Sequence, residues 1–130
     1  MPHPDETLLD FNRMQELREI VCEDPAEELP DEIKDLYVTY LRSGAKTIDQ
    51  AESALRAGNT NEGSRLIHSL KGASANAGAP KVRDLALQLE QMLKKNIGTL
   101  DEHLALLAEI RSVFDETHQA ILRCYKVNVP

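Results

Sequence analysis

The sequence has 130 residues, of which 42% are hydrophobic and 28% charged, and these values are typical of one soluble globular domain. Its formal net charge of −7 argues against nucleic acid and anionic membrane surfaces as partners. No apolar run approaches the roughly 18 residues that a membrane span needs. The first ten residues also lack the apolar segment of a signal peptide, so we expect a cytoplasmic protein.

The spacing of apolar residues three and four apart predicts helices and no strand. Local signals mark several helix ends. Asn59 and Thr99 are candidate N-caps, Gly78 suits a left-handed turn after a helix, and Pro80 suits a first helical turn. Together these features predict five helices, at 8–22, 31–57, 60–77, 80–95 and 99–125.

Five amphipathic helices joined by short loops indicate an all-α fold. We expect the last four helices to form an antiparallel four-helix bundle, with the additional N-terminal helix as a cap or lid. The domain is then expected at 8–125, between a flexible N-terminal tail at 1–7 and a C-terminal tail at 126–130.

The helix predicted at 60–77 carries the most informative residues. At 100° per residue, Leu66, Leu70, Ala73 and Ala77 face one way, and His68 points the opposite way. A packing role therefore does not explain this histidine. The residues predicted beside it on the outer face are Ser64, Arg65, Lys71, Gly72 and Ala75.

This setting suits phosphoryl chemistry. A solvent-exposed imidazole is largely neutral and nucleophilic at cellular pH. Lys71, one turn after His68, disfavours the protonated ring and can neutralise the oxygens of an attached phosphoryl group. Gly72 costs roughly 0.5–1 kcal/mol relative to alanine inside a helix, and it leaves a bare surface that another protein can approach closely.

A histidine and a lysine one turn apart are common on helix surfaces, so the pattern gains its meaning from its context. Residues 65–95 also carry an excess of basic side chains, which is either an ordinary solvated surface or a patch suited to an acidic partner. The basic residues are Arg65, Lys71, Lys81, Arg83, Lys94 and Lys95, against Asp84 and Glu90.

At these positions the sequence resembles the histidine-containing phosphotransfer (HPt) domain family. The shared pattern is an apolar residue followed by His-x-Leu-Lys-Gly, small residues, Gly-Ala and a helix with Leu…Leu-Glu. The resemblance covers about residues 8–125. The matching residues are Ile67, His68, Leu70, Lys71, Gly72, Ala73, Ser74, Gly78, Ala79, Leu85, Leu89 and Glu90.

The resemblance implies that His68 accepts a phosphoryl group on Nε2, that Lys71 assists electrostatically and that Gly72 gives a partner access. Members of the family often place a glutamine of the fourth helix near the active histidine, and here Glu90 occupies that position. The implied partner surface comprises Ser64, Arg65, Lys71, Gly72, Ala75 and Glu90.

The implied function is that of a monomeric phosphocarrier without autokinase activity. It would relay a phosphoryl group between receiver-domain aspartates of a hybrid sensor kinase and a response regulator. We expect no cofactor of its own, because the Mg²⁺ would belong to the acidic pocket of the partner receiver domain.

Two other functions are compatible with a helical bundle. One is a binding protein that docks on a kinase or receiver and inhibits it without carrying phosphate. The other is a metal-dependent bundle enzyme, but such sites need two Glu-x-x-His pairs and further glutamates. Asp115-x-x-His118 is a single imperfect copy, so we expect no metal site.

Overall fold

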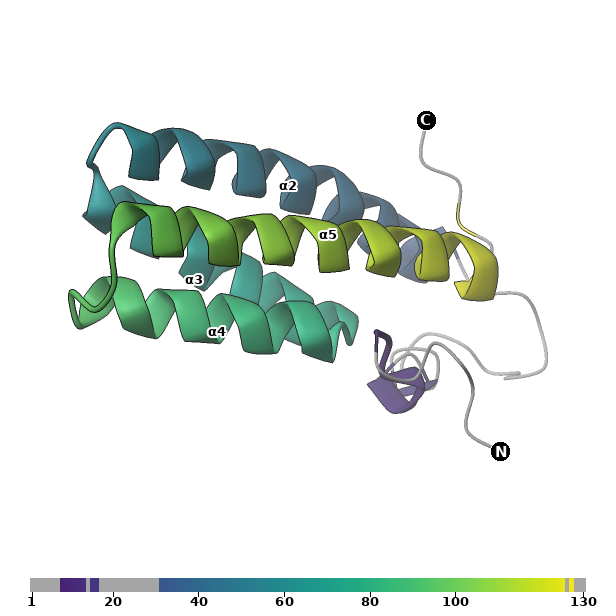
Figure 1. Ribbon diagram of the computed structural model, residues 1–130. Coiled ribbons are helices and arrows are strands. Elements are labelled where there is room, and N and C mark those ends of the chain that lie inside the picture. Colours follow the sequence, from purple (N-terminus) through teal and green to yellow (C-terminus); the bar gives the residue numbers. More distant parts are fainter. Residues whose placement is uncertain (1–7, 14, 17–30, 126, 128–130) are drawn as a thin grey trace.

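A computed structural model describes residues 8–13, 15–16, 31–125 and 127 of the chain. Four long helices make up most of this part (Figure 1). Helix α2 spans Asp31–Arg56, α3 spans Thr60–Ala77, α4 spans Pro80–Lys94 and α5 spans Leu100–Tyr125. The helices predicted from 31 onward therefore begin and end within one residue of their expected positions.

The four helices run up and down in turn and form an antiparallel bundle (Figure 1). Helix α2 packs against α3 and α5, and α4 packs against the same two helices. Short connections at 57–59, 78–79 and 95–99 allow this arrangement, because consecutive helices must lie side by side. The predicted all-α bundle is confirmed.

Local chemistry explains the helix ends. The side chain of Asn59 accepts a hydrogen bond from the backbone N–H of Glu62 (3.2 Å), which caps the start of α3. Thr99 caps α5 in the same way, through its hydroxyl and the N–H of Glu102 (3.2 Å). Gly78 ends α3 with φ at 74°, a left-handed conformation that favours glycine.

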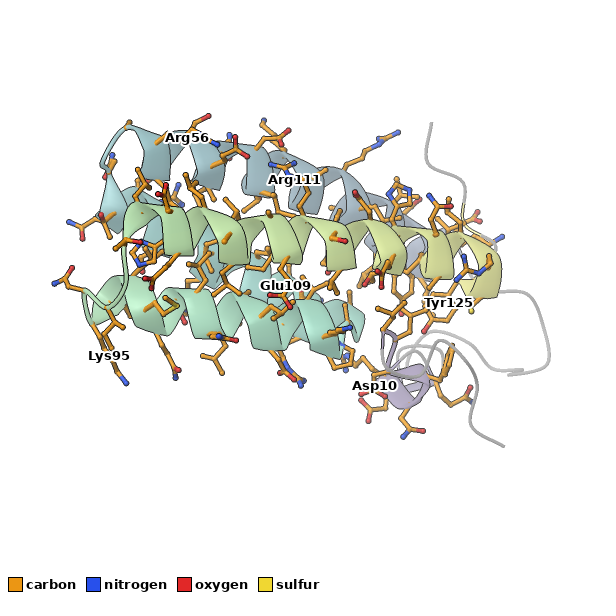
Figure 2. All side chains as sticks on the ribbon, in the orientation of Figure 1. Asp10, Arg56, Lys95, Glu109, Arg111 and Tyr125 are labelled. Atoms are coloured by element: carbon orange, nitrogen blue, oxygen red, sulfur yellow. The ribbon has the colours of Figure 1, made fainter. Side chains whose placement is uncertain are left out.

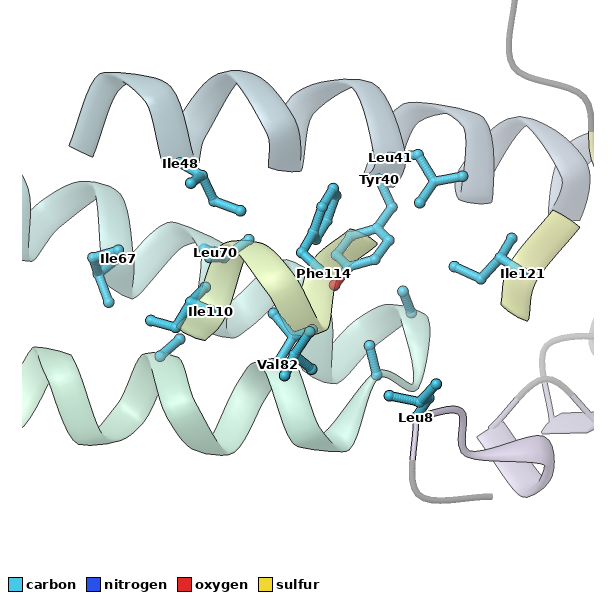
Figure 3. Close-up of a cluster of buried hydrophobic side chains, with 14 of the residues drawn as sticks. Leu8, Tyr40, Leu41, Ile48, Ile67, Leu70, Val82, Ile110, Phe114 and Ile121 are labelled. Carbon is cyan, nitrogen blue, oxygen red and sulfur yellow. The ribbon is translucent and has the colours of Figure 1, made fainter. Parts of the chain in front are cut away.

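The core runs the length of the bundle and consists of aliphatic and aromatic side chains from all four helices (Figure 3). One buried polar pair crosses it: the hydroxyl groups of Tyr40 on α2 and Ser74 on α3 lie 2.8 Å apart. This hydrogen bond satisfies both hydroxyls away from water and fixes α2 against α3. The largest fully buried side chains are Tyr37, Phe114, Leu9, Leu41, Ile48, Ile67, Leu70, Leu89, Leu107, Ile110, Ile121 and Val82.

The prediction of Ala73 as a core residue is wrong. Ala73 is exposed, and the buried positions of α3 are Gly63, Leu66, Ile67, Leu70, Ser74 and Ala77. These buried positions face α2 and α4, the two helices against which α3 packs. Ala73 falls just outside them, in a shallow groove between α2 and α3 that also contains Tyr40 and Asn76.

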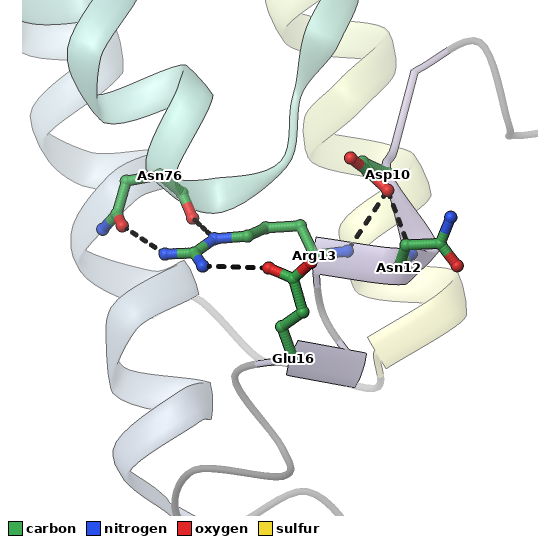
Figure 4. Close-up of polar contacts among 5 residues, drawn as sticks. All are labelled: Asp10, Asn12, Arg13, Glu16 and Asn76. Atoms are coloured by element: carbon green, nitrogen blue, oxygen red, sulfur yellow. Dashed lines mark hydrogen bonds and ion pairs between the residues drawn. The ribbon is translucent and has the colours of Figure 1, made fainter.

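The N-terminal helix begins later than predicted. Residues 11–13 and 15–16 are helical, while Asp10 is the cap: its carboxylate accepts hydrogen bonds from the N–H groups of Asn12 (3.0 Å) and Arg13 (3.2 Å) (Figure 4). Leu8 and Leu9 lie before this cap and are buried in the core. The remainder of the helix predicted at 8–22, and residues 1–7 and 128–130 of the predicted tails, lie outside the described residues.

Arg13 joins this N-terminal segment to the end of α3. Its guanidinium group donates to the backbone oxygen of Asn76 (2.9 Å) and to the side-chain oxygen of the same residue (2.7 Å) (Figure 4). The backbone N–H of Asp10 also donates to the carbonyl of Gly78 (2.6 Å). The segment therefore covers the α3–α4 turn and satisfies carbonyl groups that the end of α3 leaves without helical partners.

Candidate functional site

The candidate site is built on the part of α3 that faces away from the core. Leu66, Ile67 and Leu70 are buried and fix the orientation of the helix. His68 consequently points outward, and 63% of its side chain is exposed. The imidazole lies at the edge between α3 and α4, where it can meet both water and the side chains of α4.

The nearest of these α4 side chains is Glu90, whose carboxylate is almost completely buried, with 3% of the side chain exposed. Its Oε2 atom lies 2.5 Å from Nδ1 of His68, and its Oε1 atom accepts a hydrogen bond from Nζ of Lys71 (2.7 Å). Nζ of Lys94, one turn further along α4, lies 3.4 Å from Oε2. One buried carboxylate thus joins a histidine and two lysines.

The surroundings of Glu90 decide its charge. Burial opposes ionisation of the carboxyl group, but the hydrogen bonds from Lys71 and His68 and their nearby charges outweigh it. They hold the pKa of Glu90 below its ordinary value of 4.5. The group is therefore an ionised carboxylate at neutral pH and can act only as a hydrogen-bond acceptor.

This acceptor fixes the tautomer of the imidazole. Because the carboxylate cannot donate, the proton in the short contact with His68 belongs to Nδ1. A neutral ring with its proton on Nδ1 carries its free lone pair on Nε2. The arrangement therefore presents a nucleophilic nitrogen away from Glu90, on a largely exposed ring.

The side chain of Lys71 is more buried than we expect for a residue beside a solvent-exposed histidine. Only 26% of its side chain is exposed, and its ammonium group bonds directly to Glu90. In the sequence, Lys94 stands out only as one of the basic residues in excess at 65–95. Its spacing four residues after Glu90 is a signal for a helical ion pair, but the contact gains interest only once Glu90 is placed beside the histidine.

The other predicted surface residues share the outer side of α3 but differ in their contacts. Arg65 pairs with Glu62 (2.5 Å), and Ser64 is half-buried. Gly72 and Ala75 are exposed, and nothing lies within 4 Å of the position that a Cβ on Gly72 would occupy. The exposed surface of α3 at Gly72 and Ala75, which we call the bare ridge, therefore carries no side chain larger than a methyl group. It is open to a large partner.

The other histidines that the structure describes have different surroundings from those of His68. His103 bonds to the carbonyl of Ile97 through Nε2 (2.7 Å), and His118 is half-buried on α5. Within the described ranges, no three His, Cys, Asp or Glu side chains gather closely enough to hold a metal ion. None of the described helices has the length and apolar character needed to cross a membrane.

Comparison with known proteins places this geometry in context. The family model described as Hpt domain matches residues 35–120, a range that includes α3 and α4 in full. No curated protein matches the chain significantly.

Two solved structures share its architecture. The chain is similar to histidine-containing phosphotransfer protein B from Pseudomonas aeruginosa PAO1, with a TM-score of 0.77, 23% identity and coverage of 91% of this chain and 94% of that one. It is also similar to a rice protein described as a histidine-containing phosphotransfer protein, with a TM-score of 0.72, 23% identity and coverage of 88% and 79%. At this level of identity the likeness concerns the fold.

Proposed function

The chain belongs to the Hpt domain family, and from this premise we propose that it carries a phosphoryl group on Nε2 of His68. The donor and acceptor would be receiver-domain aspartates of a hybrid sensor kinase and a response regulator. The observation that carries the proposal is the contact of Nδ1 with the buried Glu90 carboxylate, because it leaves the lone pair of the exposed ring on Nε2.

The transfer would proceed by direct displacement. The Nε2 lone pair attacks the phosphorus of an aspartyl phosphate, a P–N bond forms and the P–O bond breaks with its electrons leaving on the aspartate carboxylate. Such reactions depend on positioning and on neutralising the phosphoryl oxygens. Lys71 would supply positive charge beside the ring, and Lys94 would add to it from α4.

The partner would need to bring its aspartate close to His68. The bare positions at Gly72 and Ala75 support this approach, because no side chain beyond a methyl group projects from the ridge there. The Mg²⁺ required for the aspartate chemistry would belong to the receiver domain. The sequence contains no glycine-rich nucleotide loop, so we propose a carrier that depends on a partner for its phosphoryl group.

Incubation with a phosphorylated receiver domain tests the proposal. The protein should gain an acid-labile, base-stable label, which His68→Gln should abolish and the control His118→Gln should retain. The free energy of unfolding of His68→Gln should stay within about 1 kcal/mol of wild type, since the new amide can still donate to Glu90. Label that persists in a folded His68→Gln variant would disprove the assignment, and a wild type that inhibits a receiver without gaining label would favour a binding protein instead.

A further inference from the structure

The contact between Glu90 and His68 has a consequence for the phosphorylated protein. We infer that the Glu90 carboxylate keeps a proton on Nδ1 of His68 throughout the transfer cycle. Phosphorylated His68 then stays in its protonated, reactive form at neutral and mildly alkaline pH. This inference rests on the proposed function and assigns to Glu90 the part of a positioning residue that controls the reactivity of the carrier.

The ionisable groups near the ring come from the two helices that meet there. Glu90 hydrogen-bonds the ring directly at 2.5 Å, whereas Lys71 and Lys94 bond to the same carboxylate. Arg65, one turn before His68, is paired with Glu62. A direct hydrogen bond to a buried anion outweighs the effect of more distant and partly exposed cations.

The remaining helix that packs on α3 meets it on another side. Helix α2 contacts α3 through groups such as the buried Tyr40 and Ser74 hydroxyls. Among the described residues, no hydrogen bond or ion pair joins the imidazole to a side chain of α2. The charge that acts on Nδ1 is therefore chiefly that of Glu90.

The proton matters because of the leaving group. When Nε2 accepts the phosphoryl group, a ring that keeps its Nδ1 proton becomes a cationic phosphoimidazolium, which the carboxylate stabilises as an ion pair. In the donor step the P–N bond breaks, its electrons return to Nε2 and the acceptor oxygen forms the new P–O bond. The ring then leaves as neutral imidazole, and no proton has entered or left.

Loss of the Nδ1 proton would change this balance. The same P–N bond would then have to break with an imidazolate anion as the leaving group, which is a far poorer one. A neutral glutamine at position 90 could accept a similar hydrogen bond through its amide oxygen, but it would not stabilise the positive charge on the ring. Glu90→Gln therefore separates the charge of Glu90 from its shape.

Glu109 offers a matched control. It is an exposed carboxylate on α5 (Figure 2). Glu109→Gln therefore makes the same change in net charge on a helix other than the two that carry the site. Wild type, Glu90→Gln and Glu109→Gln would each be phosphorylated with phosphoramidate, a small-molecule donor to imidazole. Loss of the phosphoryl group from His68 to water would then be followed by phosphorus NMR across the neutral and alkaline range.

Wild type and Glu109→Gln should retain their fast rate to a pH about one unit higher than Glu90→Gln. At about pH 8, their phosphoryl group should be lost about tenfold faster than that of Glu90→Gln. Coincident profiles for wild type and Glu90→Gln would overturn the inference, as would an equal shift in Glu109→Gln. A wild type that takes no label on His68 would refute the proposed function and the inference together, whereas label with coincident profiles refutes the inference alone.

Nitrogen NMR of phosphorylated wild type provides a test that does not depend on the folding of Glu90→Gln. The Nδ1 resonance of His68 should remain that of a protonated nitrogen at a pH where free phosphohistidine has lost this proton. Titration of Nδ1 in step with free phosphohistidine would contradict the inference.

Discussion

The aromatic ring of Phe114 on α5 packs directly against Gly44 on α2. A Cβ built on Gly44 would lie 2.5 Å from one carbon of the aromatic ring and 2.6 Å from the next. The ring is itself buried and packs against Tyr40, with ring centroids 5.5 Å apart. The absence of a side chain at Gly44 therefore sets how closely α2 and α5 approach.

Gly44→Ala should destabilise the bundle. Overpacking a well-filled core costs about 1–3 kcal/mol, and the better helix propensity of alanine returns at most about 1 kcal/mol. We expect the free energy of unfolding, measured by urea denaturation, to fall by about 1–2 kcal/mol. Gly72→Ala is the control, since nothing lies within 4 Å of its Cβ, and it should gain about 0.5–1 kcal/mol. Equal effects at both glycines would show that the contact with Phe114 is unimportant.

Glu90 should make the protein lose stability in acid. Its pKa is lower in the folded protein than the ordinary value of 4.5, because hydrogen bonds from Lys71 and His68 outweigh the opposing effect of burial. The stability that this carboxylate contributes is thus fully present above its unfolded pKa and is lost as pH falls through its folded pKa. Between pH 6 and 3, the free energy of unfolding should fall further for wild type than for Glu90→Gln. Parallel curves from urea denaturation would contradict this prediction.

Lys71→Ala should affect both transfer and stability. Loss of a positioned cation should slow transfer from a phosphorylated receiver by about ten- to a hundredfold. This effect is small for the removal of a charge-stabilising group, because the site is open to solvent. The buried Glu90 also loses its 2.7 Å partner, which should cost about 1–3 kcal/mol. Lys94→Ala provides a comparison, since its contact is longer, at 3.4 Å, and its side chain is 60% exposed. Stopped-flow rates should therefore change more for Lys71→Ala, and equal rates in both variants and wild type would show that these lysines only solubilise the surface.

The parts of this structure that could be predicted from the sequence depend on neighbours along the chain. A cap at Asn59 or Thr99 and a left-handed glycine at 78 act within one turn of a helix, and these positions fix the ends of α3 and α5. The outward direction of His68 likewise follows from the period of a single helix. The start of the first helix was missed because Leu8 and Leu9 fit the apolar pattern, although they lie before the cap at Asp10.

The arrangement around Glu90 could not be predicted in the same way. Its contacts with His68 and Lys71 depend on the relative height and rotation of α4 against α3, and no spacing within one helix encodes these quantities. A glutamate within an amphipathic helix also gives no sign that its carboxylate will be buried. The resemblance indicated the position, but the contacts of a charged residue there follow only from the packing of α4 against α3.

Gly72 provides the sharpest test of how a partner approaches His68. It lies one turn after the histidine on the exposed side of α3, and the space beside its α-carbon is open. In Gly72→Gln, the better helix propensity should leave the melting temperature unchanged or raise it. The new side chain would nevertheless project beside the imidazole and hold the partner's aspartate beyond the short distance that direct transfer requires.

The expected result for Gly72→Gln is therefore a pair of opposite effects: equal or greater stability together with weaker receiver binding and slower transfer. A thermal melt, a titration with a receiver domain and a transfer time course measure the three quantities. Gly72→Ala is the graded control, because a methyl group adds helix propensity but little reach, and it should bind and transfer nearly as wild type does. Normal binding and transfer by Gly72→Gln would mean that the partner reaches His68 from the α4 side, across Lys94, and that the bare ridge on α3 is not the docking surface.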